Sequence, residues 1–229
     1  MERKTGAMAA AALLALLAAA TLAGQGWRGK PATAWTAEEA ERILRDSPWS
    51  QKKEVRFARH RSAADSLPQP PQPGLPPLIQ QRPPERIIPS DFVTYVVRWE
   101  SADPVVQAFA RLEELGQHGT AIALGAPPRR PDDRYVVTVV TTQFSEMGED
   151  LLDALDETQL RLYARLKTRA GEAVPLEVER VRGTDTAAVH FFFPREQDGR
   201  PLVVAGIEQV EFILETRRFT LKSKFDLGS

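Results

Sequence analysis

The chain has 229 residues, of which 30 are Lys or Arg and 31 are Asp or Glu, so its formal net charge at pH 7 is −1. A charge balance so close to neutrality gives no electrostatic reason to expect nucleic acid as a partner. The chain contains no cysteine, which excludes disulfide bonds, thiolate metal sites and a cysteine nucleophile.

Residues 1–23 are typical of a secretory signal peptide. Arg3 and Lys4 precede an uncharged run from Gly6 to Ala23 that consists almost wholly of Ala and Leu, and a basic start, an apolar stretch and then small residues is the order that the secretion machinery recognises. We expect cleavage after Ala23 and a periplasmic or extracellular protein. The alternative is an uncleaved anchor, because the run is close to the shortest length that spans a bilayer; the membrane would then be a partner only through this segment.

Proline marks a boundary in the mature chain. Nine of the 18 prolines lie between Ser62 and Ser90, and proline lacks a backbone donor and restricts φ. We therefore predict an extended linker at 62–90, with a short segment at 24–61 before it and a globular domain at 91–229 after it. A proline-rich run can also dock in an aromatic groove, but a spacer is the simpler interpretation.

A short helix is predicted at 36–46. Thr36 is a typical helix cap, and Glu39 three residues later completes a capping box. Pro48 ends the helix, because the residue before a proline is disfavoured in the helical conformation. A short strand around Val55 follows.

This helix is too short to be stable alone, because isolated helices below about 12–15 residues are marginal in water. Its apolar side must therefore pack on another surface. The main domain of the same chain is the simpler choice, and a partner such as another envelope protein is the alternative. In that alternative the docking surface consists of Trp35, Ile43, Leu44 and Trp49.

From residue 91 the pattern changes to that of an α+β domain. Phe92 to Trp99 is apolar on both faces, as expected of a central strand, and Ser101 to Pro104 is a strong helix start with proline in the first turn. In chain order we predict a strand at 92–99, a helix at 101–115, a strand at 120–124, a strand at 135–142 and a helix at 145–157.

Beyond residue 157 apolar and polar residues alternate as they do in strands. We predict a strand at 160–167 that pairs antiparallel with a strand at 176–179, so that Lys167 faces Glu177. This pairing neutralises a basic and aromatic stripe that is otherwise typical of a polyanion-binding surface. The stripe consists of Arg161, Tyr163, Arg165 and Lys167.

The last residues predict a hairpin that reverses around Thr216. Charge and hydrophobicity favour one register, in which Glu211 faces Lys222 and Phe212 faces Leu221. A strand at 187–193 and a turn at 198–199 precede this hairpin.

The predicted fold class is therefore α+β. We expect a largely antiparallel β-meander of about six strands in the domain, with two or three short helices, preceded by the signal peptide and the proline-rich linker. Helices should cover one face of the sheet, with a two-sheet sandwich as the alternative.

The residues that could carry chemistry are scattered. Histidines occur only at His60, His118 and His190, and a lone histidine on a strand, such as His190, is more typical of a packed residue than of a ligand. An acidic cluster could supply the paired carboxylates of a glycoside hydrolase, although carboxylates on the outer side of one helix are usually only solvated. The cluster consists of Glu149, Asp150, Asp153, Asp156 and Glu157.

The sequence has no nucleophile elbow, phosphate loop, zinc-binding helix or dinucleotide fingerprint. We therefore assign no catalytic residue, and we expect no cofactor and no metal.

Three short blocks can be compared with a known family. They are Trp35-Thr36-x-x-Glu39-Ala40-x-x-Ile43-Leu44-x-x-Ser47-Pro48-Trp49, then Arg98-Trp99-Glu100-Ser101-Ala102, and finally Val210-Glu211-Phe212 with Lys224-Phe225. They are similar to blocks of exported proteins found mainly in acidobacteria, for which no activity is assigned. The resemblance implies an envelope or secreted location and carries over no functional residue.

The sequence thus predicts an exported, non-enzymatic binding or envelope-associated protein. The alternative is a secreted hydrolase that uses carboxylates. A cleft with converging acidic or histidine side chains and displaced pKa values would favour the hydrolase, whereas an exposed apolar groove would favour the binding protein.

Overall fold

The computed structural model describes residues 26–56, 92–125, 133–144, 151–182, 186–204 and 209–227. The predicted signal peptide at 1–23 and the predicted linker at 62–90 lie outside the described residues. Within these ranges, none of the helices combines the length and the apolar character needed to cross a membrane.

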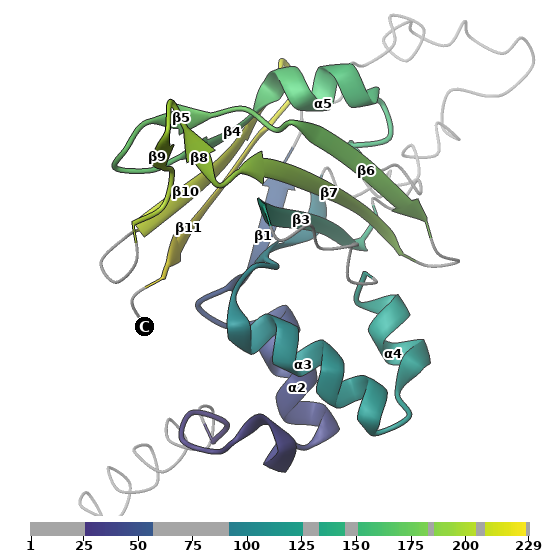
Figure 1. The fold of residues 1–229 in the computed structure, drawn as a ribbon. Coiled ribbons are helices and arrows are strands. Elements are labelled where there is room, and N and C mark those ends of the chain that lie inside the picture. Colours follow the sequence, from purple (N-terminus) through teal and green to yellow (C-terminus); the bar gives the residue numbers. More distant parts are fainter. Residues whose placement is uncertain are drawn as a thin grey trace, which may run out of the picture.

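Two antiparallel sheets form most of the fold (Figure 1). The larger sheet has the strand order β1-β2-β3-β7-β6, and its strands are β1 (Ser50–Arg56), β2 (Phe92–Trp99), β3 (Arg134–Gln143), β6 (Glu177–Arg182) and β7 (Ala187–Pro194). The smaller sheet has the order β11-β10-β4-β5, and its strands are β4 (Ala164–Lys167), β5 (Glu172–Ala173), β10 (Gln209–Glu215) and β11 (Thr220–Asp226). A separate hairpin pairs β8 (Glu196–Gln197) with β9 (Arg200–Pro201).

Aromatic side chains join the two sheets. The ring of Phe212 on β10 lies 5.1 Å from that of Phe191 and 6.3 Å from that of Phe193, both on β7. The ring of Phe225 on β11 lies 5.8 Å from that of Trp99 on β2. All five side chains are buried, and burial of a side chain such as Phe stabilises by about 1.5–3 kcal/mol. The sheets therefore face each other, as in the two-sheet alternative.

Short helices flank the pair of sheets. Figure 1 shows α2, α3 and α4 together on one side of the sheets and α5 on the opposite side. The helices are η1 (Ala32–Ala34), α2 (Ala37–Arg45), α3 (Asp103–Glu114), α4 (His118–Ala123) and α5 (Glu157–Tyr163). Because all strand pairs of the described residues are antiparallel, the predicted α+β, largely antiparallel fold is confirmed, with four α-helices in the described ranges rather than two or three.

The N-terminal segment packs on the rest of its own chain. The predicted capping box is present, since the Thr36 hydroxyl accepts a hydrogen bond from the backbone of Glu39 and the Glu39 carboxylate accepts one from the backbone of Thr36. Helix α2 contacts α3, and β1 pairs with β2 along its whole length. Trp27 completes the packing, because its ring lies 6.2 Å from that of Trp35 and 5.8 Å from that of Trp49. The preferred interpretation of the short helix is confirmed.

The predicted strand at 120–124 is wrong, because these residues belong to α4 and the turn after it. Ala121 and Leu124 are buried while Ile122 is exposed, which is the three-residue spacing of a helix. A short apolar run does not distinguish a strand from a helix by periodicity alone.

The predicted helix at 145–157 is misplaced. Residues 145–150 lie outside the described residues, 151–155 form turns, and α5 begins where the predicted helix ended. The Asp156 carboxylate accepts from the backbone of Gln159 at 2.7 Å, and the Gln159 side chain accepts from the backbone of Asp156 at 3.0 Å. This capping box starts the helix, so Leu162 is 63% exposed instead of facing the core.

The predicted pairing of 160–167 with 176–179 is also wrong. Strand β4 pairs with β10 and β5, and β6 pairs with β7. Lys167 consequently forms its ion pair with Glu172 at 3.4 Å and not with Glu177. Alternation specifies which face a strand buries, but every antiparallel neighbour with the same alternation satisfies it.

The C-terminal hairpin buries the predicted face in a different register. Phe212 and Leu221 are buried as expected. However, Glu211 lies opposite Lys224, whereas the predicted partner was Lys222. A shift by two residues leaves every side chain on the same face, so hydrophobicity does not discriminate between the two registers.

The turn of this hairpin decides the register. Residues 216–219 form a four-residue loop between the strands, and the Thr216 hydroxyl accepts hydrogen bonds from the backbone N–H groups of Arg218 and Phe219. The predicted reversal used a shorter turn. Satisfying these backbone groups inside the loop moves the first cross-strand pair to Glu215 and Thr220.

Truncation of Ile43, a core side chain of α2, should destabilise the whole fold. Ile43 is fully buried, and we expect Ile43→Ala to lower the free energy of unfolding by about 2–5 kcal/mol through lost packing and the remaining cavity. Urea denaturation followed by tryptophan fluorescence measures this. Glu38→Ala on the exposed side of the same helix is the control, with an expected change below about 0.5 kcal/mol. An unchanged denaturation midpoint for Ile43→Ala would mean that α2 does not pack on its own chain and instead binds a partner protein.

Candidate functional site

A buried arginine lies at the end of β2. The Arg98 side chain is only 1% exposed, and all five of its N–H donors have acceptors. Nε and Nη2 donate to the Glu100 carboxylate at 2.7 and 2.6 Å. Nη1 donates to the carbonyls of Leu44 and Leu124 at 3.2 and 3.0 Å, and Nη2 also donates to the carbonyl of Gly125 at 3.2 Å. A buried guanidinium is tolerated because its charge and its donors are both satisfied.

The three carbonyl acceptors come from helix ends. Leu44 lies in the last turn of α2, and Leu124 and Gly125 follow α4. The last carbonyls of a helix have no intrahelical partner and carry its negative partial charge, so a cation is favourable there. The guanidinium also lies 4.8 Å from the centre of the Phe109 ring of α3, within cation–π range. Arg98 on β2 therefore contacts α2, α3 and α4 and holds them against the sheet.

His190 lies on the same face of the sheet as Arg98. It pairs with Thr138 across β3 and β7, is fully buried, and its Nδ1 lies 2.8 Å from the Thr138 hydroxyl oxygen. Burial lowers the pKa of His190 to about 4, with Glu100 opposing and Arg98 reinforcing the shift. His190 is therefore neutral at neutral pH. Its side chain has no access to solvent.

Gly125 brings the end of α4 close to the sheet. Its φ is +80°, a left-handed conformation that favours glycine. An added Cβ would lie 3.0 Å from Val140 Cγ2 and 3.4 Å from Ala188 Cβ. Val140 and Ala188 form a small buried cluster with Val96 on this face. The absence of a side chain at Gly125 thus permits the close approach.

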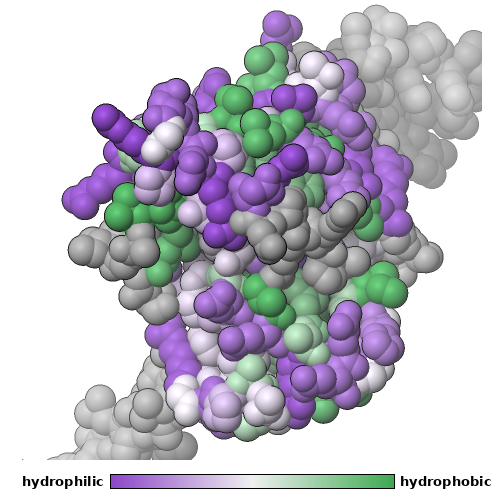
Figure 2. All heavy atoms as spheres, viewed as in Figure 1, coloured by the Kyte–Doolittle hydropathy of each residue, from purple (hydrophilic) through white to green (hydrophobic). Residues whose placement is uncertain are grey.

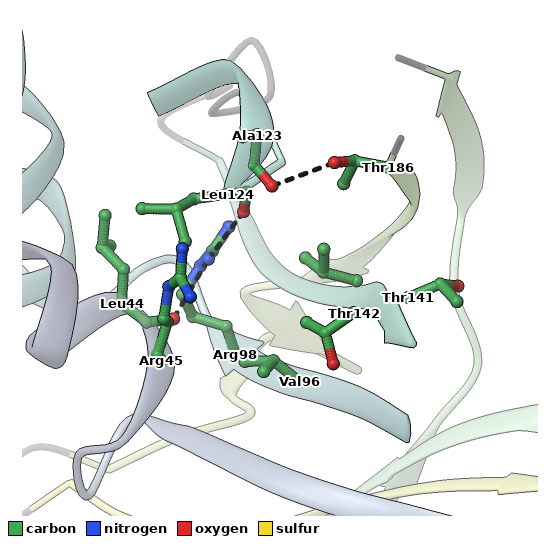
Figure 3. A pocket seen from close by; sticks show the side chains of 10 residues that line it. Leu44, Arg45, Val96, Arg98, Ala123, Leu124, Thr141, Thr142 and Thr186 are labelled. Atoms are coloured by element: carbon green, nitrogen blue, oxygen red, sulfur yellow. Dashed lines mark hydrogen bonds between the residues drawn. The ribbon is translucent and has the colours of Figure 1, made fainter. Parts of the chain in front are cut away.

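A half-open pocket of about 220 Å³ lies between α2, α4 and this face of the sheet (Figure 3). Arg98 contributes to its floor. Two threonine hydroxyls at its edge donate to backbone carbonyls, Thr142 to Thr94 at 3.1 Å and Thr186 to Ala123 at 3.0 Å. The described lining residues are Leu44, Arg45, Val96, Arg98, Ala123, Leu124, Val140, Thr141, Thr142 and Thr186.

The remaining visible surface has no broad apolar face. Figure 2 shows hydrophobic side chains in separate small patches among hydrophilic ones. Three of the exposed apolar side chains lie near α5, namely Leu162, Val174 and Leu176.

The predicted docking residues occupy several places. Trp35 and Ile43 are buried in the core. Leu44 is buried as well and lines the pocket over Arg98. Trp49 is buried against Trp27 and borders another, more open pocket with Trp99. The four side chains therefore do not form an exposed docking surface in this structure.

The predicted acidic cluster is divided among structural contacts. Asp153 forms ion pairs with Arg180 at 3.6 Å and with Arg182 at 2.6 Å. Asp156 caps α5, and Glu157 lies in its first turn. Two members lie outside the described residues, namely Glu149 and Asp150. Asp153 and Asp156 are thus occupied by ion pairing and capping.

The histidines are not brought together either. His118 is exposed at the start of α4, His190 is buried on β7, and His60 lies outside the described residues. Among the described residues, no three His, Asp or Glu side chains gather as they would around a metal ion.

The basic stripe is divided between a helix and a strand. Arg161 and Tyr163 belong to α5, whereas Arg165 and Lys167 belong to β4. Arg161 donates to the carbonyl of Pro175 at 3.4 Å. The four side chains therefore do not line one strand.

The role of Arg98 was not predicted from the sequence. The available signal was a charged residue inside a strand that is otherwise apolar on both faces, followed two residues later by an acid. Such a charge is almost never buried without a partner. The three partner carbonyls lie 54, 26 and 27 residues away in the chain, so no local pattern identifies them.

Comparison of the chain with protein-family models, with curated proteins and with solved structures finds no match. The resemblance to exported acidobacterial proteins therefore stays a prediction.

Loss of the Arg98 guanidinium should destabilise the protein strongly. We expect Arg98→Met to lower the free energy of unfolding by about 3–5 kcal/mol, because Glu100 and three carbonyls are then buried without their donor. Chemical denaturation measures the change. Arg165→Met on the exposed side of β4 is the control and should change it by less than about 0.5 kcal/mol. Equal effects of the two substitutions would contradict the role assigned to Arg98.

The protein should become less stable as the pH is lowered, because His190 is buried in its neutral form. Its pKa is about 4 in the folded state and 6.5 without the fold. The contribution is fully present above pH 6.5 and is lost as the pH falls towards 4, by about 3 kcal/mol at 1.36 kcal/mol per pKa unit. The charged groups that face it are Glu100, Arg98 and, across β6, Glu179. Denaturation at pH 7, 5.5 and 4 should show a weaker pH dependence for His190→Gln, and an identical loss in both proteins would refute the assignment.

Proposed function

We propose that this chain is an exported, non-enzymatic binding protein whose ligand site is the pocket over Arg98. Export is supported by Arg3, Lys4 and the Ala and Leu run. The single observation that supports binding at this place is the pocket, with apolar walls, hydroxyl groups at its edge and a rigidly held floor. Small-molecule sites are typically concave and mostly apolar, with a few placed polar groups.

The floor supports binding because it is organised before any ligand arrives. The Arg98 guanidinium is held by the ends of α2 and α4 and by Glu100. Because these groups already have partners, ligand binding does not need to order them, which lowers its entropic cost.

The occupied carboxylates favour binding over hydrolysis. Hydrolysis with two carboxylates requires a pair that faces one cleft across a substrate bond. Asp153 is instead engaged by two arginines, and the fully buried Glu100 is engaged by Arg98. His190 is held neutral and buried. These groups have structural partners in place of a substrate.

Filling the pocket should abolish binding. Ala123 is exposed at the end of α4 and lines the pocket, whereas its neighbour Ile122 is 59% exposed and is not among the lining residues. We expect ligand-observed NMR with a library of small metabolites, using protein from the periplasmic fraction, to give hits that bind the wild-type chain and Ile122→Phe. The same hits should not bind Ala123→Phe.

Two outcomes would contradict the proposed function. Hits that persist in Ala123→Phe would place the binding site elsewhere. Turnover of a chromogenic glycoside or ester by the wild-type chain, lost in a folded Asp153→Asn variant, would instead support the hydrolase.

A further inference from the structure

The pocket over Arg98 has a positive edge. Its described lining residues include two arginines and no Asp or Glu. The charge of Arg98 is balanced by Glu100 at 2.6 Å, so the remaining cation is Arg45. Figure 3 shows the Arg45 side chain extending from the end of α2 along the pocket towards Leu124.

Arg45 is free to turn towards a ligand. Its side chain is 56% exposed, and its ion pair with Glu41, four residues earlier on α2, has an N–O distance of 3.9 Å. An exposed pair at this helical spacing is weak and is screened by salt. An anion that enters the pocket can therefore displace Glu41 at little cost.

The walls of the pocket favour an apolar body. Leu44, Val96, Leu124 and Val140 supply hydrocarbon side chains. The hydroxyls of Thr142 and Thr186 already donate hydrogen bonds to backbone carbonyls, so they do not require a polar group on the ligand. The pocket thus combines one cation at its edge with an apolar interior.

The volume limits the size of the occupant. An apolar cavity of about 150 Å³ accepts benzene, with six non-hydrogen atoms. By proportion, a pocket of about 220 Å³ accepts a molecule of roughly eight to ten non-hydrogen atoms.

We propose that the pocket binds small amphiphilic monocarboxylates, with the carboxylate at Arg45 and the apolar body against Val96 and Val140. The inference rests on the proposed function, because it names the ligand class of the same pocket. A carboxylate matches the planar guanidinium and can accept two hydrogen bonds from it.

The test compares two probes of equal size, benzoate and benzamide, by NMR titration of the protein recovered from the periplasmic fraction. We expect benzoate to bind with a Kd of about 1 mM, as befits so small a ligand, and benzamide at least tenfold more weakly. Arg45→Gln should remove this difference. Arg42→Gln is the matched control, because Arg42 lies on the same helix and has an equivalent ion pair with Glu38 but does not line the pocket.

The outcomes separate this inference from the function on which it rests. Equal binding of benzoate and benzamide, with both lost in Ala123→Phe, overturns the carboxylate inference and leaves the pocket as the binding site. Equal weakening of benzoate by Arg42→Gln and Arg45→Gln also overturns it, because the effect would then be general electrostatic attraction. Benzoate binding that survives in Ala123→Phe overturns both proposals.

Discussion

The ion pair of Arg98 and Glu100 is the constraint on which the arrangement of helices depends. A guanidinium and a carboxylate at 1% and 0% exposure are stable only when their charges are balanced and the remaining donors have acceptors. Glu100 meets part of this requirement, and the carbonyls at the ends of α2 and α4 meet the rest. The ends of α2 and α4 are consequently held against β2 by hydrogen bonds from the Arg98 guanidinium. Apolar packing of α2 on α3 adds to this.

The same interaction shapes the candidate site. With its donors occupied, Arg98 gives the pocket a rigid floor without a free charge, and Arg45 is left as the cation at the edge. Gly125 allows the end of α4 to lie close to Val140 and Ala188, which forms one side of the pocket. Structural support and the proposed binding chemistry thus come from one short part of the fold, where α2, α4 and β2 meet.

Local signals in the sequence were sufficient where the stabilising contacts are themselves local. The capping box of Thr36 and Glu39 was predictable because both hydrogen bonds join residues three apart. The equivalent box of Asp156 and Gln159 is also local, but the alternation that follows it in the sequence predicted a strand where α5 lies. The pattern of a central strand at β2 was clear because both of its faces are buried.

By itself, the sequence determined the α+β class, the capped helix α2, the long strands and the buried face of the C-terminal hairpin, because composition, capping and alternation act over a few residues. Only the tertiary structure decided the strand partners of β4 and β6, the register of β10 with β11, and the pocket. Alternation is unchanged by a two-residue shift or by exchange of one antiparallel neighbour for another. The register is therefore set by the turn at 216–219, and the strand partners are set by the packing of the two sheets. The pocket likewise required Leu44, Arg98 and Leu124, which meet only because a buried arginine needs acceptors from distant helix ends.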